Sequence, residues 1–240
     1  VADGSDTRRG VPTLRSLMGP EVSVLVGDYW LVKAVSQILG ADRGAIRSIE
    51  IFAKTLSDLA EGEMLQLQKA QQGDTDRDDY LRIIYCKTAS LFEAACVTAA
   101  VSVGASEEIE AAARDYSIAL GNAFQIRDDM LDYSGTDQVG KPLGVDIPEQ
   151  KITMPLLGAL ASVSECEAER VRSLVKDIVG HPENRDEIVR FVKENGGLEA
   201  ARDELDAFVE KAVRALDVLP ESFEKNCLVE LAYFTGKRVM

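Results

Sequence analysis

The chain has 240 residues, a formal net charge of −14 and a hydrophobic fraction of 46%, which is ordinary for a globular protein. The acidic balance argues against a nucleic-acid partner, because such binding needs a basic surface that displaces phosphate counterions. An acidic protein that binds anionic substrates must gather its positive charge locally or recruit metal cations.

The cysteines and the single histidine do not predict a zinc site. Cys86, Cys96, Cys166 and Cys227 are widely spaced, whereas structural zinc needs Cys and His ligands at short spacing. Scattered thiols are typical of a reduced, cytoplasmic protein, which is the location we expect. No signal peptide is visible. The most apolar stretch, residues 94–105, is too short to cross a bilayer, so we expect a buried helix there and no membrane span.

Helical periodicity runs through most of the chain. No proline lies between Pro20 and Pro142, which permits a long succession of helices. Apolar residues recur at three- and four-residue steps, and no segment shows the sustained alternation of a strand. The predicted helices cover residues 22–39, 45–71, 77–104, 106–134, 152–163, 166–179, 184–195, 198–216 and 221–234. This pattern predicts an all-α fold in one packed bundle.

Several of these helices have recognisable ends. Asp76 and Ser106 are predicted N-caps, because their side chains can accept hydrogen bonds from the first unpaired backbone N–H groups. Gly196-Gly197 predicts a helix stop. Residues 135–150 carry three glycines, two prolines and Lys141, which indicates a loop. Loops beside charged helix ends are places where function concentrates.

The sharpest chemical signal is the acidic run Asp128-Asp129-Met130-Leu131-Asp132. On a helix, Asp128 and Asp132 lie one turn apart on the same face, and Asp129 lies about 100° round the axis. Like charges at this spacing destabilise a helix by roughly 0.2–0.5 kcal/mol per pair. The run is either an exposed acidic patch or a set of carboxylates that binds Mg²⁺, a hard cation that prefers oxygen ligands. Its apolar neighbours favour the second interpretation.

Magnesium held by one or two carboxylates usually completes its shell with water and substrate phosphate, so cationic side chains should lie nearby. A lone lysine is more often a solvated surface group. Lys87 is the strongest candidate, because it lies in the largely apolar stretch 84–89, where an idle charge is unfavourable. The cationic candidates are Arg8, Arg9, Lys87, Lys141 and Lys151.

One apparent motif is rejected. Gly135, followed after four residues by Gly140-Lys141, matches the start of a phosphate-binding P-loop. The next residue should be Ser or Thr, but it is Pro142, and the segment follows a predicted helix instead of a strand. A P-loop NTPase is therefore not predicted. Lys141 remains a candidate phosphate ligand in a loop bounded by glycines.

In combination, the motifs resemble the trans-prenyl diphosphate synthases of the polyprenyl synthetase family, in particular the geranylgeranyl and octaprenyl diphosphate synthases. The resemblance runs from the first residue almost to the last. It implies an isoprenoid-synthase-type helical bundle around a central substrate cavity. The matching segments are the second aspartate-rich motif at 124–132, the lysine loop at 140–146 and 151–155, the KTAxLF helix at 87–92, the signatures at 27–29 and 62–66, and the double-arginine segment at 8–13.

The resemblance also implies a role for each matching residue. Mg²⁺ on the diphosphate of the allylic substrate would be held by Asp128, Asp129 and Asp132, with Gln125 one turn earlier. The same diphosphate would be gripped by Lys87, Thr88, Lys141, Lys151 and Arg8. Arg9 would serve isopentenyl diphosphate. Glu63 and Gln66 would lie one layer further from the substrate.

One part of the family pattern is missing from this chain. The first aspartate-rich motif reads DDxxD in the family, whereas this chain begins Val1-Ala2-Asp3. Asp3 matches the last acid of that motif and would be a further metal ligand. The expectation is a single polyprenyl synthetase catalytic domain over residues 1–240 that lacks its N-terminal helices and the first two acids of this motif. Alone, such a chain should be a poor catalyst.

The activity implied is head-to-tail prenyl transfer. An allylic diphosphate would condense with isopentenyl diphosphate by Mg²⁺-assisted ionisation, which yields a linear trans-polyprenyl diphosphate and diphosphate. The resemblance also implies a homodimer.

Three alternatives remain open. A terpene synthase usually lines its cavity with aromatics, which make up only 6% of this chain. A head-to-head synthase would not be expected to carry the Lys141 loop. A non-catalytic regulatory subunit of a heteromeric prenyl synthase is favoured by the missing motif, but the acidic run and Lys87 argue against it.

Overall fold

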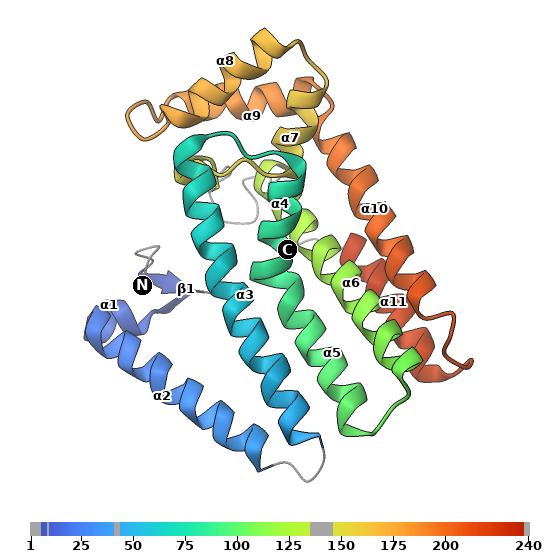
Figure 1. The fold of residues 1–240 in the computed structure, drawn as a ribbon. Coiled ribbons are helices and arrows are strands. Elements are labelled where there is room, and N and C mark those ends of the chain that lie inside the picture. Colours follow the sequence, from blue (N-terminus) through green and yellow to red (C-terminus); the bar gives the residue numbers. More distant parts are fainter. Residues whose placement is uncertain (1–5, 9, 41–43, 135–145, 238–240) are drawn as a thin grey trace. The chain divides into compact units, whose positions relative to one another are not determined.

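The computed structural model describes residues 6–8, 10–40, 44–134 and 146–237. The chain divides into two compact units, Val1–Glu50 and Ile51–Met240 (Figure 1). Helices account for nearly all of the regular structure in both units, so the predicted all-α fold class is confirmed.

The first unit opens with a short ribbon that the sequence pattern did not predict. Strands β1 (Thr7–Arg8) and β2 (Val11–Pro12) pair antiparallel, with Thr7 opposite Pro12. Gly10 makes the turn at φ +76°, a conformation that glycine adopts without a steric penalty. Strands of two residues are too short to show the alternation by which a strand is recognised.

Two helices follow the ribbon in this unit. Helix α1 (Leu14–Met18) is capped by Thr13, whose Oγ1 accepts a hydrogen bond from the backbone N–H of Ser16 at 3.2 Å. Helix α2 (Pro20–Leu39) begins with a proline at its first position, where the missing N–H has no helical partner to lose. The prediction included α2 from residue 22 and missed the one-turn helix α1.

Helix α3 (Ala45–Gln72) runs from the first unit into the second, and the remaining helices belong to the second unit. Their bounds agree with the predicted helices to within a few residues at most ends. They are α4 (Arg77–Ile84), η1 (Tyr85–Ala89), α5 (Ser90–Ser102), α6 (Glu107–Ser134), η3 (Ile147–Glu149), α7 (Met154–Ala161), α8 (Glu165–Lys176), α9 (Asn184–Glu194), α10 (Gly197–Ala215) and α11 (Phe223–Lys237).

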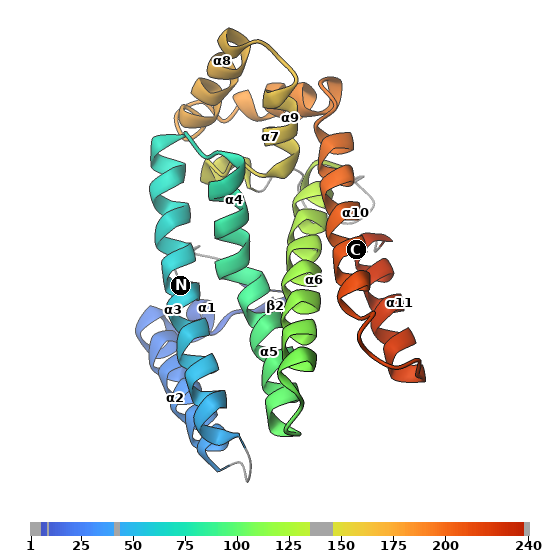
Figure 2. The ribbon, with the colours of Figure 1, turned by 45° about the vertical axis from the view of Figure 1, so that its right-hand side comes forward.

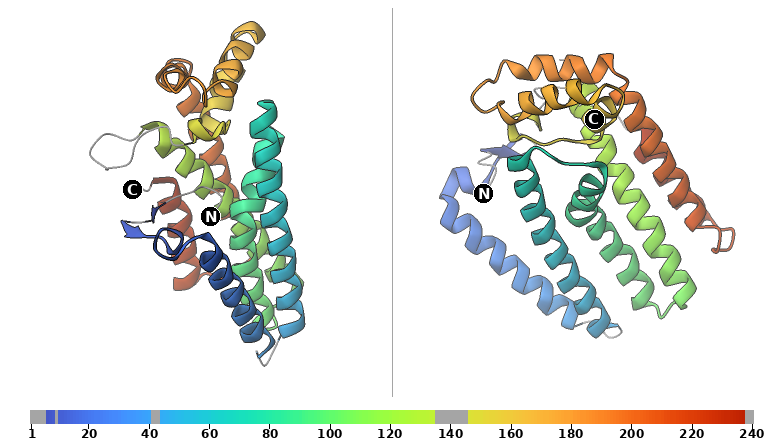
Figure 3. Two further views of the ribbon diagram at one scale, coloured as in Figure 1. Left: turned by 90° about the vertical axis from the view of Figure 1, so that its left-hand side faces the viewer. Right: turned by 45° about the horizontal axis from the view of Figure 1, so that its top comes forward.

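Helix α6 is central to the packing of the second unit. It contacts α5 on one side and α10 and α11 on the other (Figure 2). Its buried positions include Ala119, Ala123 and Ile126, each with no exposed surface. Helices α8 and α9 lie side by side, and α7 packs against both of them and against α10 (Figure 3). The acidic run 128–132 therefore lies on the best-packed helix of this unit.

The predicted helix ends are confirmed. At the start of α4, Asp76 Oδ1 accepts from the Asp79 N–H at 2.8 Å, and Asp79 Oδ2 accepts in return from the Asp76 N–H at 3.2 Å. Ser106 Oγ accepts from the Ile109 N–H at 3.4 Å. Gly196 follows the end of α9 at φ +69°, the left-handed conformation that stops a helix.

The stretch 94–105 is less buried than expected. Within it only Val97 and Val101 are buried, while Val103 is 73% exposed. Two helical stretches of the described chain, Pro20–Leu39 and Arg77–Ser102, are long and apolar enough to cross a membrane by composition alone, each with a mean hydropathy of 1.3. Core helices of soluble proteins meet the same criterion, so this finding weighs little against the expected absence of a span.

Helix α6 passes so close to η1 that only glycine fits at position 121. A Cβ atom at Gly121 would lie 2.5 Å from Ala89 Cα, a backbone atom that cannot swing aside. We expect Gly121→Ala to lower the free energy of unfolding by about 1–3 kcal/mol, the usual loss when a packed interior is overfilled. Urea unfolding followed by circular dichroism measures this change.

The matched control is Gly27→Ala in α2. No described atom would lie within 4 Å of a Cβ at Gly27. There alanine should raise stability through its better helix propensity, by up to about 1 kcal/mol. Equal effects of the two substitutions would contradict the close approach at Gly121.

Candidate functional site

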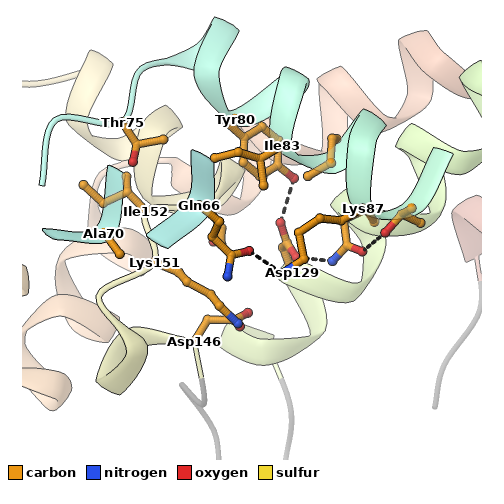
Figure 4. Close-up of a pocket in the computed structure, with 14 residues that line it drawn as sticks. Gln66, Ala70, Thr75, Tyr80, Ile83, Lys87, Asp129, Asp146, Lys151 and Ile152 are labelled. Atoms are coloured by element: carbon orange, nitrogen blue, oxygen red, sulfur yellow. Dashed lines mark hydrogen bonds and ion pairs between the residues drawn. The ribbon is translucent and has the colours of Figure 1, made fainter. Parts of the chain in front are cut away.

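A pocket of about 250 Å³ opens in the second unit where α3, α4, η1 and α6 meet the segment that leads into α7. Figure 4 shows polar side chains from all of these elements directed toward it. The charged or amide-bearing residues that line it are Gln66, Lys87, Gln125, Asp129, Asp146 and Lys151.

Lys87 and Thr88 reach this pocket from a π-helical turn. The sequence pattern predicted one continuous helix over 77–104, whereas the backbone widens to π-helix over Tyr85–Ala89. Single π-turns of this kind are rare and are frequently found at functional sites. The turn lies against two glycines, Gly121 on α6 and Gly62 on α3. A Cβ atom added at Gly62 would lie 2.6 Å from Cys86 Cβ.

The ammonium group of Lys87 is held in place by two partners on α3. Its Nζ lies 2.6 Å from Glu63 Oε2 and donates to Gln66 Oε1 at 2.9 Å. An ammonium carries three donors, and these contacts occupy two of them. The lysine is thus fixed at the pocket wall with donor capacity left for an anionic ligand.

Asp129 is the buried acid of the acidic run. Its side chain is 4% exposed and receives two hydrogen bonds, from Tyr80 Oη to Oδ2 at 2.7 Å and from Gln125 Nε2 to Oδ1 at 2.8 Å. Burial raises the pKa of Asp129 to about 8, and nearby Asp146 adds to the rise, while the bonds from Tyr80 and Gln125 oppose it. A cation bound next to Asp129 would favour the ionised carboxylate and so lower this pKa.

Asp128 and Asp132 are half-buried on the neighbouring face of α6. Asp132 Oδ2 accepts a hydrogen bond from the Asp146 backbone N–H at 3.1 Å, which ties the end of α6 to the segment before η3. Asp146 in turn pairs with Lys151, whose Nζ lies 3.1 Å from Asp146 Oδ1. Burial lowers the pKa of Lys151, but Asp146 and Glu149 outweigh it and the net pKa is raised, so the lysine stays cationic.

The donor set fits magnesium bound jointly with a ligand. Within the described residues, no three Asp, Glu, His or Cys side chains come together as a ready-made metal cage. Magnesium does not need one, since it usually takes one or two carboxylates and completes its shell with water and substrate phosphate. Asp129 of α6 lines the same pocket as Lys87 and Lys151, and this set of side chains offers that combination.

The structure brings five of the predicted site residues into one pocket: Lys87, Thr88, Gln125, Asp129 and Lys151. Glu63 contacts Lys87 without lining the pocket, whereas Gln66, which the resemblance placed one layer further from the substrate, lines the pocket wall. Arg8 lies in β1 of the first unit. Asp3, Arg9 and Lys141 lie outside the described residues, so their roles stay predictions.

Two residues of the pocket that pair with predicted site residues had no role in the prediction. Asp146 was part of the recognised lysine loop, and its acidic side chain next to Lys151 was an available signal. Tyr80 was not singled out. Its position seven residues before Lys87, two helical turns along an apolar stretch, was the only local signal, and its partner Asp129 is 49 residues away.

Comparisons with known proteins agree with this geometry. The family model for polyprenyl synthetases matches residues 1–194. Octaprenyl diphosphate synthase from Haemophilus influenzae is 38% identical over 99% of this chain and 72% of its own length. The corresponding enzyme from Escherichia coli is 35% identical over 99% of this chain and 73% of its own length.

Solved structures give the same result. A decaprenyl diphosphate synthase from Rhodobacter capsulatus has a TM-score of 0.88 and 38% identity, covering 100% of this chain and 73% of that one. A polyprenyl synthase from Caulobacter crescentus, complexed with calcium and isoprenyl diphosphate, has a TM-score of 0.87 and 36% identity, covering 99% of this chain and 72% of that one.

Proposed function

This chain belongs to the polyprenyl synthetase family, and we propose that its pocket binds the allylic diphosphate during head-to-tail prenyl transfer. The chain is a prenyltransferase of the trans-prenyl diphosphate synthase type. The single observation that carries the proposal is the meeting of the buried carboxylate Asp129 with two lysines, Lys87 and Lys151, in one cavity. Opposite charges gathered in this way suit a diphosphate bound together with a cation.

The cation in the proposal is Mg²⁺. Asp128 and Asp132, with Asp129 between them, would hold it at the end of α6, and Asp3 is proposed as a further ligand. When bound, it would neutralise the diphosphate and make it a better leaving group. The Caulobacter relative was solved in complex with both calcium and isoprenyl diphosphate, which supports the binding of a divalent ion and a prenyl diphosphate by this fold.

The side chains of the pocket would orient the leaving group. Lys87, held by Glu63 and Gln66, would donate to diphosphate oxygens from one wall, and Lys151 from another. Fixed donors aimed at developing negative charge stabilise a transition state without having to reorganise. Lys141 and Arg8 are proposed as further ligands of this diphosphate, and Arg9 as a ligand of isopentenyl diphosphate.

The bond changes need no protein nucleophile. The allylic C–O bond breaks, and its electron pair leaves with the diphosphate. The double bond of isopentenyl diphosphate attacks the resulting carbocation, and a proton is then lost to the released diphosphate. The relatives, which include octaprenyl and nonaprenyl diphosphate synthases, favour neither a terpene synthase nor a regulatory subunit.

Chelation tests the metal part of this proposal. EDTA should stop prenyl transfer by the full-length protein, because the diphosphate would lose the cation that neutralises it, and added Mg²⁺ should restore the rate. The measurement is incorporation of labelled isopentenyl diphosphate into extractable prenyl product. A rate indifferent to chelation would refute the role of the metal.

We further propose that the protein is a cytoplasmic homodimer. Static light scattering of the purified protein should give twice the mass of its chain, and a monomer would contradict this.

Recovery of the protein in the soluble fraction after cell lysis and centrifugation would agree with the proposed location. Recovery in the membrane fraction would oppose it.

A further inference from the structure

We propose that Tyr80 is a positioning residue for the diphosphate site and acts through Asp129, whose carboxylate it fixes in the orientation that the site requires. The inference rests on the proposed function of the pocket. It adds a residue of α4 to machinery otherwise drawn from η1, α6 and the lysine loop.

The geometry around Asp129 carries this inference. Its two oxygens have separate donors, Tyr80 on α4 and Gln125 one turn earlier on α6 (Figure 4). Gln125 is itself oriented, because its Oε1 accepts from Thr88 Oγ1 at 2.8 Å. A flipped Gln125 amide would turn its oxygen towards the Asp129 carboxylate and lose that bond. The carboxylate is therefore clamped between donors that reach it from α4 and, through Gln125, from η1.

The clamp leaves room for a ligand. A carboxylate has about four acceptor sites, and these two bonds take one on each oxygen. The remaining sites on each oxygen can face a cation, or water bound to it, in the pocket that Asp129 lines. Without Tyr80 the carboxylate could rotate about its Cβ–Cγ bond, and only the Gln125 bond would resist.

The position of Tyr80 is itself rigid. Its side chain is 3% exposed, and the preceding residue, Asp79, belongs to the capping box at the start of α4. Asp79 also pairs with Lys69 on α3, with 2.7 Å between Lys69 Nζ and Asp79 Oδ2. The hydroxyl is thus presented to Asp129 by a helix turn anchored on both sides. Partners of this kind behind a metal-binding carboxylate typically change affinity or activity by about 10- to 100-fold when removed.

The test is Tyr80→Phe with Tyr116→Phe as its matched control. Tyr116 is 2% exposed and donates to the Leu228 carbonyl oxygen at 2.8 Å, so both substitutions delete one buried hydroxyl and one hydrogen bond. Of these two tyrosines, Tyr80 lines the pocket and Tyr116 does not. Binding of inorganic diphosphate in the presence of Mg²⁺, measured by calorimetry, should weaken about 10- to 100-fold in Tyr80→Phe and stay unchanged in Tyr116→Phe.

A double-mutant cycle asks whether Tyr80 acts through Asp129. In an Asp129→Asn background, Tyr80→Phe should cause little further loss of diphosphate binding, because the carboxylate that it orients is gone. Steady-state kinetics of the single variant should show a raised KM for the allylic diphosphate and an unchanged KM for isopentenyl diphosphate.

Each contrary outcome has a distinct meaning. Wild-type binding by Tyr80→Phe would overturn the inference alone. So would equal losses in Tyr80→Phe and Tyr116→Phe, or an undiminished loss in the Asp129→Asn background. If the wild-type protein bound diphosphate no better with Mg²⁺ than without it, the proposed function would fail and this inference with it.

Discussion

Replacement of Asp128 by alanine is expected to lower turnover of the full-length protein with dimethylallyl or farnesyl diphosphate by about 10³-fold or more. A bound divalent cation contributes several kcal/mol of charge stabilisation to the transition state, and loss of about 4 kcal/mol corresponds to that factor. Asp128 is half-buried at the end of α6, beside the buried Asp129 and one turn before Asp132. The measurement is initial rate at saturating Mg²⁺.

The control for this variant is Asp115→Ala. Asp115 is an exposed acid on the same helix, about 20 Å along its axis from Asp128. It should keep the wild-type rate. A near-normal rate for Asp128→Ala, with unchanged circular dichroism, would refute the metal role of that residue.

Replacement of Lys87 by methionine is expected to lower kcat/KM for the allylic diphosphate by about 10²- to 10³-fold, the usual loss when one fixed donor to a developing oxyanion is removed. Methionine keeps an unbranched side chain but removes the ammonium. It also leaves Glu63 without its partner 2.6 Å away. Part of the loss should therefore come from the Glu63 carboxylate, which is left without its cationic partner close to the pocket wall.

Lys225→Met is the matched control. Lys225 is likewise held by a glutamate, with Nζ 2.8 Å from Glu221 Oε1, and by an uncharged oxygen, the Leu219 carbonyl, at 3.0 Å. It does not line the pocket. An equal loss of kcat/KM in both variants would show that removal of any such lysine disturbs the fold. An unaffected Lys87→Met would remove Lys87 from the site.

The helices could be predicted because their signals are local. Period, capping residues and stop glycines act over one or two turns, and α6 over Glu107–Ser134 lies within one residue of its predicted start. The same locality explains the misses. The ribbon at Thr7–Arg8 is too short to carry a pattern. The π-turn at Tyr85–Ala89 differs from an α-helix only in that its backbone hydrogen bonds span five residues instead of four.

The candidate site, too, could be predicted only where its signals are local. The acidic run and Lys87 were recognisable because charges inside apolar stretches are unfavourable without a purpose. Their environments were not recognisable. Asp129 is 4% exposed and bonded to Tyr80 of α4, while Asp128, the adjacent residue, is half-buried.

The sequence by itself determined the helices and the chemical types available to a diphosphate site, since both depend on neighbours along the chain. Tertiary structure alone decided that Tyr80 meets Asp129 across 49 residues and that Lys87 is held by Glu63. It also decided that η1 packs against the glycines Gly62 and Gly121. Such pairings depend on how helices approach one another. That approach is set by the shapes of whole packed faces, which no local pattern records.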